Sequence, residues 1–303
     1  MLLLSLAAAT ARAQYDPSFS HYWAMEPSFN PAAVGKEGKL NVAGGYAHQL
    51  AGFENNPRTM YAGGDMPFYA MGSYHGVGLQ FMNDAIGLFS HKRIGLQYAY
   101  QPRLLGGTLS LGLQALMLSE TFDGSKLKMI DTDRALPTSQ VDGTDLDLSA
   151  GIYYKHRRWY AGLSVLHLNA PTVEIGEKNE INVSSTFYLT GGYNIRLKNP
   201  FLTIHTSFLA RTDGVATRAD VTGRLMYSHE KRVMYAGVGY SPGNSVTVYI
   251  GGDVHGVRLG YSYEVYTTAI SIGNGSHELF VGYQTELNLF KKGRNLHKSV
   301  RIL

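Results

Sequence analysis

The chain has 303 residues, a mean hydropathy of −0.13 and a formal net charge of +4, with 35 glycines, 21 tyrosines and no cysteine. It is too polar for a bundle of membrane helices, and without cysteine it can form neither a disulfide framework nor a thiolate metal site. The basic residues gather at expected turns and at the C-terminal end, not in a stripe with interleaved aromatic side chains. Nucleic acid is therefore not an expected partner.

The first thirteen residues predict a secretory signal peptide. Residues 1–9 form an apolar run, and the Ala-Arg-Ala sequence at 11–13 supplies the small-x-small pattern that precedes a cut before Gln14. No basic stretch precedes the apolar run, so the true start of the signal stays open.

From residue 39 onward, segments of about ten residues alternate between apolar positions and polar or glycine positions. This is the period of a β-strand whose two faces meet different surroundings. Leu96 and Tyr98, for example, alternate with Gly95 and Gln97. Fourteen such strands are expected, at residues 39–50, 57–68, 74–82, 91–102, 107–118, 144–155, 157–168, 183–196, 200–211, 217–228, 231–241, 245–254, 256–267 and 276–288.

These strands predict an all-β fold, a transmembrane antiparallel β-barrel of about fourteen strands in the outer membrane. A soluble β-sandwich would also alternate, but the export signal, the strand length and the polar inner face favour the barrel. The two longest loops, at about 119–143 and 169–182, follow odd-numbered strands, while tight turns follow even-numbered ones. Because such barrels have short periplasmic turns and long external loops, we expect both termini in the periplasm and the loop at 119–143 outside.

Two segments flank the barrel, which is expected to span residues 39–289. A barrel of this size encloses a lumen that side chains alone do not fill, so residues 14–38 are expected to fold inside it as a plug, a disordered periplasmic leader being the alternative. The candidate plug residues are Phe29, Asn30 and Pro31.

The C-terminal segment, residues 290–303, is expected to be a basic periplasmic tail. It is either simply solvated or contacts a partner by strand pairing or in a groove. The candidate partner contacts are Lys298, Arg301, Ile302 and Leu303.

The luminal face is expected to carry the polar positions of the alternation, because charges are costly on a lipid face near the membrane midplane. These side chains could line a solute path, but we favour pairing with one another or with the plug. The candidate luminal polar residues are Gln97, Gln114, Arg258 and Glu286.

No catalytic, cofactor or metal motif emerges. His277-Glu278 lacks the second histidine of a zinc-protease helix, since Val281 stands in its place. The acids around the long loop do not match a calcium loop. A membrane hydrolase would need a nucleophile beside a histidine on adjacent strands, for which Ser164 with His167 and Thr203 with His205 are the conceivable pairs.

Several short motifs, in this order along the chain, resemble the PorP/SprF family of Bacteroidetes outer-membrane proteins. The resemblance runs over the whole mature length. It is carried by Tyr15-Asp16-Pro17-Ser18-Phe19-Ser20, Phe29-Asn30-Pro31-Ala32 with Gly35, Asn83-Asp84 with Gly87, Ser276-His277-Glu278 and the ending Lys298-Ser299-Val300-Arg301-Ile302-Leu303.

The resemblance implies a non-catalytic barrel of the type IX secretion system that helps deliver or hold secreted surface proteins, such as gliding adhesins. Its implied partners are outer-membrane lipid, a secreted surface cargo protein and periplasmic secretion components, with no cofactor. A channel for hydrophobic solutes resembling long-chain fatty-acid transporters is the alternative, and a membrane hydrolase is a more distant one.

Overall fold

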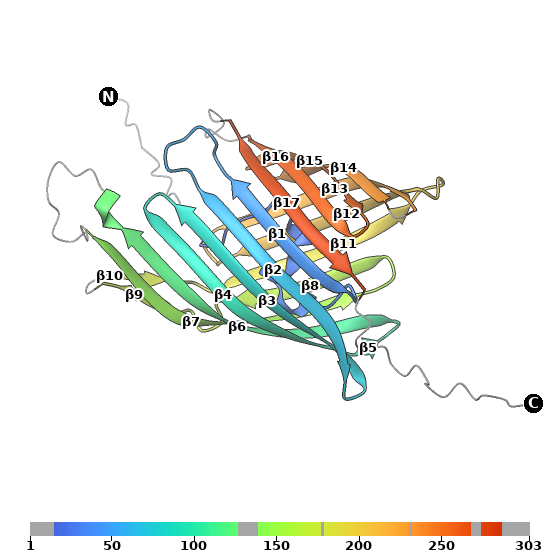
Figure 1. The fold of residues 1–303 in the computed structure, drawn as a ribbon, viewed down its shortest axis with the longest axis horizontal. Helices are drawn as coiled ribbons and strands as arrows, with labels where there is room; N and C mark the ends of the chain where they lie inside the picture. The colour runs from blue at the N-terminus through green and yellow to red at the C-terminus, as the bar shows by residue number, and fades with distance from the viewer. Residues whose placement is uncertain (1–14, 127–138, 177–178, 231, 268–273, 287–303) are drawn as a thin grey trace, which may run out of the picture.

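The computed structural model describes residues 15–126, 139–176, 179–230, 232–267 and 274–286. Over these ranges, fourteen antiparallel strands close into one barrel (Figure 1). The barrel closes because β1 pairs with β17 and β4 pairs with β6. Within the same ranges, no helix is long and apolar enough to cross a membrane.

The barrel strands coincide with the fourteen strands predicted from the alternation, and the prediction of the fold is confirmed. Their bounds are β1 Leu40–His48, β2 Arg58–Ala70, β3 Ser73–Ile86, β4 Phe89–Gln101, β6 Gly107–Asp123, β7 Gln140–Lys155, β8 Trp159–Leu166, β11 Thr186–Arg196, β12 Leu202–Thr212, β13 Thr217–His229, β14 Arg232–Ser241, β15 Ser245–Val254, β16 Val257–Tyr266 and β17 Ser276–Thr285. Three short strands were not predicted: β5 Arg103–Leu104, β9 Thr172–Ile175 and β10 Asn179–Asn182.

The two ends of the barrel differ in their connections. At the end where β1 begins and β17 ends, here called the turn end, the links include tight turns such as Met71-Gly72 and His255-Gly256. Both residues of each turn have positive φ, as a two-residue hairpin turn of type I′ requires. The opposite end, called the loop end, carries the longer connections between β6 and β7 and between β8 and β11.

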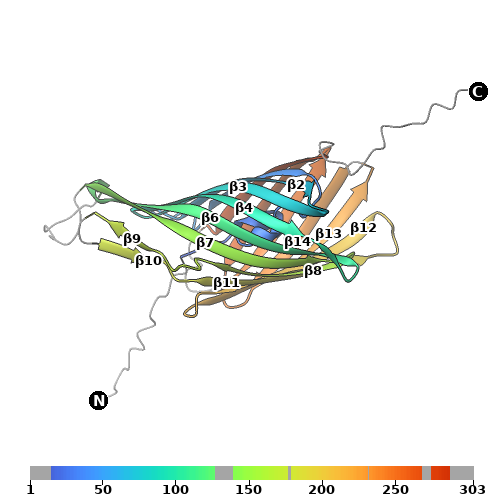
Figure 2. The same cartoon turned by 90° about the horizontal axis from the view of Figure 1, so that it is seen from below.

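The loop-end connections depart from the expected boundaries. The strands β6 and β7 run on to Asp123 and back from Gln140, so the expected loop at 119–143 is shorter than predicted. The expected loop at 169–182 contains the hairpin of β9 and β10, which lies beside β7 (Figure 2). Val173 of this hairpin is buried against Leu116 and Leu118 on the inner face of β6, so the hairpin folds over the mouth of the barrel.

The two faces of the barrel wall have opposite chemistry. Leu96 and Leu113 are 68% and 63% exposed on the outer face, whereas Gln97 and Gln114 on the inner face are each 4% exposed. This is the pattern of a wall between hydrocarbon and a polar lumen. Large aromatic residues gather on the outer face near the turn end, as in the aromatic belts of membrane barrels: Tyr74, Tyr100, Trp159, Tyr193, Tyr227 and Tyr283.

Candidate functional site

The lumen contains residues 15–38, here called the luminal segment, drawn in dark blue inside the barrel in Figure 1. At its start, Tyr15 donates a hydrogen bond to Glu120 near the loop end of β6. At its other end, Glu37 pairs with Lys155, the last residue of β7, at the turn end. The segment therefore crosses the barrel from the loop end to the turn end, where β1 begins.

This path differs from the expectation that both termini lie in the periplasm. The first described residue, Tyr15, lies at the loop end, and the last residue of β17, Thr285, lies at the turn end. The even number of strands fixes only where the first and last strands begin and end, both at the turn end. The luminal segment of 24 residues precedes the first strand and is long enough to cross a membrane-thick barrel. Its start can therefore lie at the loop end, as it does.

The luminal segment has little secondary structure of its own. It forms three short 3₁₀ turns, η1 Tyr22–Ala24, η2 Glu26–Ser28 and η3 Pro31–Ala33. Proline occupies the first turn of η2 and η3, where its missing N–H is not needed, and the side chain of Asn30 caps η3 by accepting from Ala32 N. Most backbone groups of such a chain must find partners elsewhere.

Polar side chains of the barrel wall satisfy the carbonyl groups of the luminal segment. Gln97 Nε2 donates to the carbonyl of Pro27 at 2.6 Å and at the same time to Gln114 Oε1 at 2.6 Å. Further donors come from other strands, each at 2.6 or 2.7 Å: Gln101 to Val34 O, Ser110 to Ala32 O and Ser164 to Phe29 O. These bonds fix the backbone of the segment rather than only its side chains.

A buried ionic cluster around Asp16 holds the first part of the segment. The carboxylate of Asp16 pairs with Arg93 Nη1 at 2.5 Å and with His167 Nε2 at 3.1 Å, and it accepts a hydrogen bond from Tyr188 at 2.9 Å. Two cationic partners, Arg93 and His167, offset the cost of burying this carboxylate.

His167 lies in the connection after β8 and is fully buried between two carboxylates. Its Nδ1 contacts Asp147 at 2.7 Å while its Nε2 contacts Asp16. Burial lowers the pKa of His167, but the two carboxylates raise it more, to about 9. Both ring nitrogens then carry protons and donate, and the cluster links the segment to β4, β7, β8 and β11.

Two further acids on the wall bind the segment. Glu278 on β17 accepts from the backbone N–H groups of Ser20 and His21 at 2.6 and 2.8 Å and pairs with the His21 ring at 2.7 Å. Glu120 on β6 accepts from Tyr15 and also contacts His91. Carboxylates that accept from backbone N–H groups make strong, charge-assisted hydrogen bonds.

Apolar packing and small residues complete the fit. Met25 is fully buried against Phe19 and Tyr61, and Phe29 stacks on Tyr188 with ring centroids 5.6 Å apart. The wall has no side chain at a point where the backbone of the segment touches it. A Cβ added to Gly112 would lie 2.2 Å from the backbone nitrogen of Ala32. The absence of a side chain there permits the close approach.

The lumen has a cavity at each end. One cavity of about 370 Å³ lies at the loop end and another of about 330 Å³ at the turn end. Between them, the cavity beside Phe19, Tyr22 and Phe29 measures about 20 Å³. The side chains of the luminal segment pack closely against the wall at this point, where Tyr22 is 2% and Phe29 is 6% exposed.

Residues 11–283 match the model of the family described as type IX secretion system membrane protein PorP/SprF. The chain belongs to this family. As a PorP/SprF barrel it is an outer-membrane protein, and its association is with type IX secretion. Among curated proteins there is no significant match.

Several solved structures match this PorP/SprF protein at low sequence identity. The CymD monoaromatic hydrocarbon channel is 11% identical, with a TM-score of 0.51 over 87% of this chain and 93% of its own. A Pseudomonas aeruginosa FadL homologue is 10% identical, with a TM-score of 0.45 over 81% of this chain and 88% of its own. Outer-membrane protein Omp33 of Acinetobacter baumannii is 8% identical, with a TM-score of 0.45 over 82% and 98%.

The structure places five of the eleven candidate residues of this PorP/SprF chain along the luminal segment and the wall beside it. Phe29, Asn30 and Pro31 are buried in the luminal segment, where Asn30 Nδ2 donates to Ile152 O at 3.2 Å. Gln97 and Gln114 lie on the wall, where Gln97 donates to Pro27 O of the same segment and to Gln114 Oε1.

Two other groups of candidates lie elsewhere. Arg258 faces the turn-end cavity and donates to Asn41. Glu286, in contrast, is exposed and does not face the lumen. The last pair between β17 and β1 is Thr285 with Leu40, so Glu286 lies beyond the end of the strand, where the inward and outward alternation stops. The candidate tail contacts lie outside the described residues: Lys298, Arg301, Ile302 and Leu303.

The conceivable nucleophile pair Ser164 and His167 does not form. Ser164 donates to Phe29 O, and His167 is held by Asp16 and Asp147. In the part of the chain that the structure describes, no group of three or more histidine, aspartate or glutamate side chains is arranged to hold a metal ion.

Sequence reasoning missed the ionic contacts of the segment. For Arg93 and Glu278 a signal existed, since each is a charge inside a predicted strand at an inward position, where a luminal partner is needed. For Asp16 and His21 there was none, because their partners are 77 and 257 residues away along the chain.

Proposed function

We propose that this protein is a sealed, non-catalytic barrel that helps deliver or anchor type IX secreted proteins at the cell surface, and that it is not an open channel. The observation that carries the proposal is the luminal segment, tied by its backbone to the strands all around it. A barrel built to conduct solutes keeps a continuous path, whereas the cavity beside Phe19, Tyr22 and Phe29 measures only about 20 Å³.

The nature of the contacts supports a fixed seal rather than a gate. The segment is held by charge-assisted hydrogen bonds and by buried ion pairs with partners on several strands. Breaking a buried ion pair by removing one partner costs about 3 to 5 kcal/mol. A segment secured by several such pairs together is not displaced by the binding of a weak solute.

The two ends of the barrel suit contact with proteins on both sides of the membrane. We expect the turn end to face the periplasm and the loop end, with the hairpin of β9 and β10, to face the outside. Cargo would then be held at the loop end, while periplasmic secretion components would contact the turn end and the tail residues Lys298, Arg301, Ile302 and Leu303.

The alternative, a channel for hydrophobic solutes, rests on likeness of fold. The similarity to the CymD channel at 11% identity concerns the barrel alone. Its lumen would have to offer an apolar passage, but here the wall is lined by amides and charged side chains that bind the segment.

The proposal is tested by cargo display. In a strain lacking the gene for this chain, antibody binding of a type IX cargo to whole cells should fall, and the wild-type gene should restore it. Uptake of long-chain fatty acids should be the same in all strains. Normal display in the deletion strain, or a loss of fatty-acid uptake with display unchanged, would overturn the proposal in favour of the channel.

A further inference from the structure

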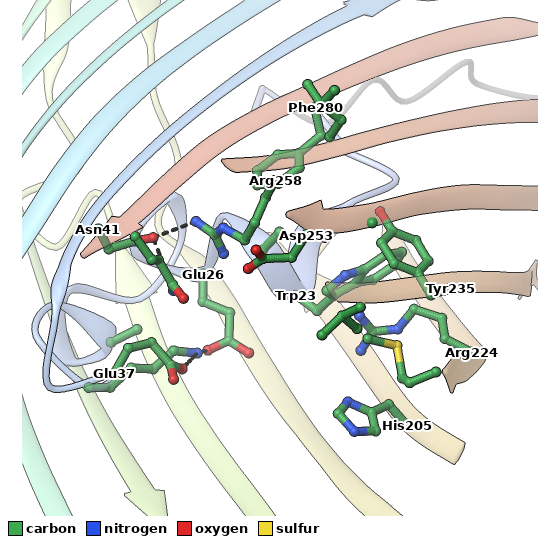
Figure 3. Close-up of a pocket in the computed structure, with 18 of the residues that line it drawn as sticks. Trp23, Glu26, Glu37, Asn41, His205, Arg224, Tyr235, Asp253, Arg258 and Phe280 are labelled. Carbon is green, nitrogen blue, oxygen red and sulfur yellow. Dashed lines mark hydrogen bonds and ion pairs between the residues drawn. The ribbon is translucent and has the colours of Figure 1, made fainter. Parts of the chain in front are cut away.

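The cavity at the turn end is a built pocket with a buried cation. It measures about 330 Å³ and lies between the luminal segment and the strands β12 to β17 (Figure 3). The principal side chains on its wall are Trp23, Lys36, His205, Arg224, Tyr235 and Arg258. All of these strands reach it with their turn-end halves, so it lies at the turn end of the barrel.

Arg224 on β13 has no anionic partner among the described residues. Its side chain is only 8% exposed, and its Nε is buried without a hydrogen bond. The guanidinium lies over the ring of Trp23, with Cζ 4.0 Å from the ring centroid. In Figure 3 it lies beside Trp23, His205 and Tyr235, and no dashed line reaches it.

The neighbouring strands offer Arg224 no carboxylate. The residue opposite it on β12 is His205, and the one opposite on β14 is Gly237. The acids on the cavity wall are bound to other groups: Glu26 to Lys36, Glu37 to Lys155, Asp65 to Asn41 and Gly35 N, and Asp253 to Gly256 N.

This arrangement calls for an anion from outside the chain. Arginine cannot be deprotonated in a protein, and a buried charge without a partner is destabilising. The contact with Trp23 offsets part of that penalty, since an arginine over an aromatic face is stabilised. An anion in the cavity would supply the missing partner.

The shape and walls of the cavity indicate which anion. A guanidinium presents a planar pair of donors that matches a carboxylate. Arg258 on β16 is a second guanidinium on the same wall, and its Nε is also buried without a partner. Apolar surface from Trp23 and Phe280 lies around these cations, and it suits a short apolar body attached to the acid.

We propose that the turn-end cavity binds a carboxylate that carries a short apolar group, with Arg224 as its anchor and Trp23 beneath the guanidinium. The volume lies at the lower end of the range of small-molecule sites, about 300 to 1,000 Å³. A free short-chain acid and the C-terminal carboxylate of a peptide share this chemistry. The site does not depend on the proposed function, since it is outside the sealed middle of the lumen.

The chain supplies its own probe of binding. It has two tryptophans, and Trp159 lies on the lipid-facing surface, so the variant Trp159→Phe leaves Trp23 as the only indole. Titration of this purified variant in detergent with sodium hexanoate and with N-acetyl-Leu-Val should give a saturable change in Trp23 emission. The amide N-acetyl-Leu-Val-NH₂ should bind at least tenfold more weakly, because it lacks the carboxylate.

Calorimetric titration of the same ligands gives a second readout that does not depend on Trp23. Affinity should fall by roughly tenfold to a hundredfold in Arg224→Gln, as expected for loss of one charge-assisted pair. The matched control is Arg218→Gln on the same strand, since Arg218 already pairs with Asp220 and Glu264. That variant should bind as the parent does.

The outcomes separate the sources of the carboxylate and decide the proposal. Tighter binding of the peptide acid than of hexanoate assigns the site to a chain end, and equal binding assigns it to a small acid. No saturable heat or fluorescence change with either acid, or equal affinity in Arg224→Gln with a heat-modifiable folded barrel, would overturn the proposal.

Discussion

Replacing Asp16 by asparagine should loosen the luminal segment without unfolding the barrel. The substitution keeps the shape of the side chain but removes the charge that pairs with Arg93 and His167. Breaking a buried ion pair from one side costs about 3 to 5 kcal/mol. Because the asparagine amide oxygen still accepts one hydrogen bond, we expect a loss of about 3 kcal/mol.

That loss sets the expected change in the opening of the segment. Each 1.36 kcal/mol is a factor of ten, so the open population should rise roughly 150-fold. The chain has no cysteine, and Ser28, which is 9% exposed inside the lumen, can be replaced by cysteine with little change in size. Maleimide labelling of this Ser28→Cys reporter measures the opening directly.

The matched control is Glu37→Gln in the same segment. Glu37 is 39% exposed and its partner Lys155 is 42% exposed, and a pair of this kind contributes about 0 to 1 kcal/mol. Labelling should therefore rise by no more than about fivefold. The reasoning fails if Asp16→Asn labels as slowly as Glu37→Gln does, since the buried cluster would then not hold the segment.

Three other predictions concern packing, pH and orientation. Gly112→Val should accelerate maleimide labelling of the Ser28→Cys reporter at least tenfold, because the valine side chain would occupy the position of Ala32. An unchanged rate would show that the luminal segment can shift away from the wall without opening. The charge of His167 stabilises the fold fully below about pH 6.5, and this contribution is lost as pH rises through the folded pKa of about 9. The Tm difference between wild type and His167→Gln should therefore shrink from pH 7 to 10. A constant difference would contradict the ion pairing of His167 with Asp16 and Asp147. A cysteine at Val215, which is 58% exposed at the loop end, should be labelled on whole cells, whereas one at Met71, fully exposed at the turn end, should be labelled only after lysis; the reverse pattern would invert the orientation.

The strands could be predicted from the sequence because their signal is local. An inner position such as Gln97 and an outer position such as Leu96 differ in polarity, and the difference repeats every second residue along each strand. The hairpin of β9 and β10 was missed because four-residue strands carry too few repeats. Its buried residue Val173 packs on Leu116 and Leu118, an apolar patch on a face otherwise expected to be polar.

The contacts of the luminal segment could not be predicted because they are not local. Asp16 meets Tyr188 across 172 positions of sequence, and periodicity carries no information about which strand a luminal residue faces. Strand parity described the barrel correctly but not the direction of the segment inside it. The unpaired Arg224 was equally invisible, since an inward arginine in a strand is compatible with a partner or with none.

Single-channel recording tests the central claim of a sealed lumen most directly. The wild-type protein in planar bilayers should show no sustained conductance, because the luminal segment fills the middle of the barrel. A variant lacking residues 15–36, refolded and heat-modifiable, should conduct steadily, since a barrel of fourteen strands without the segment leaves an open lumen. Steady conductance of the wild type, or the same conductance with and without the segment, would contradict the account.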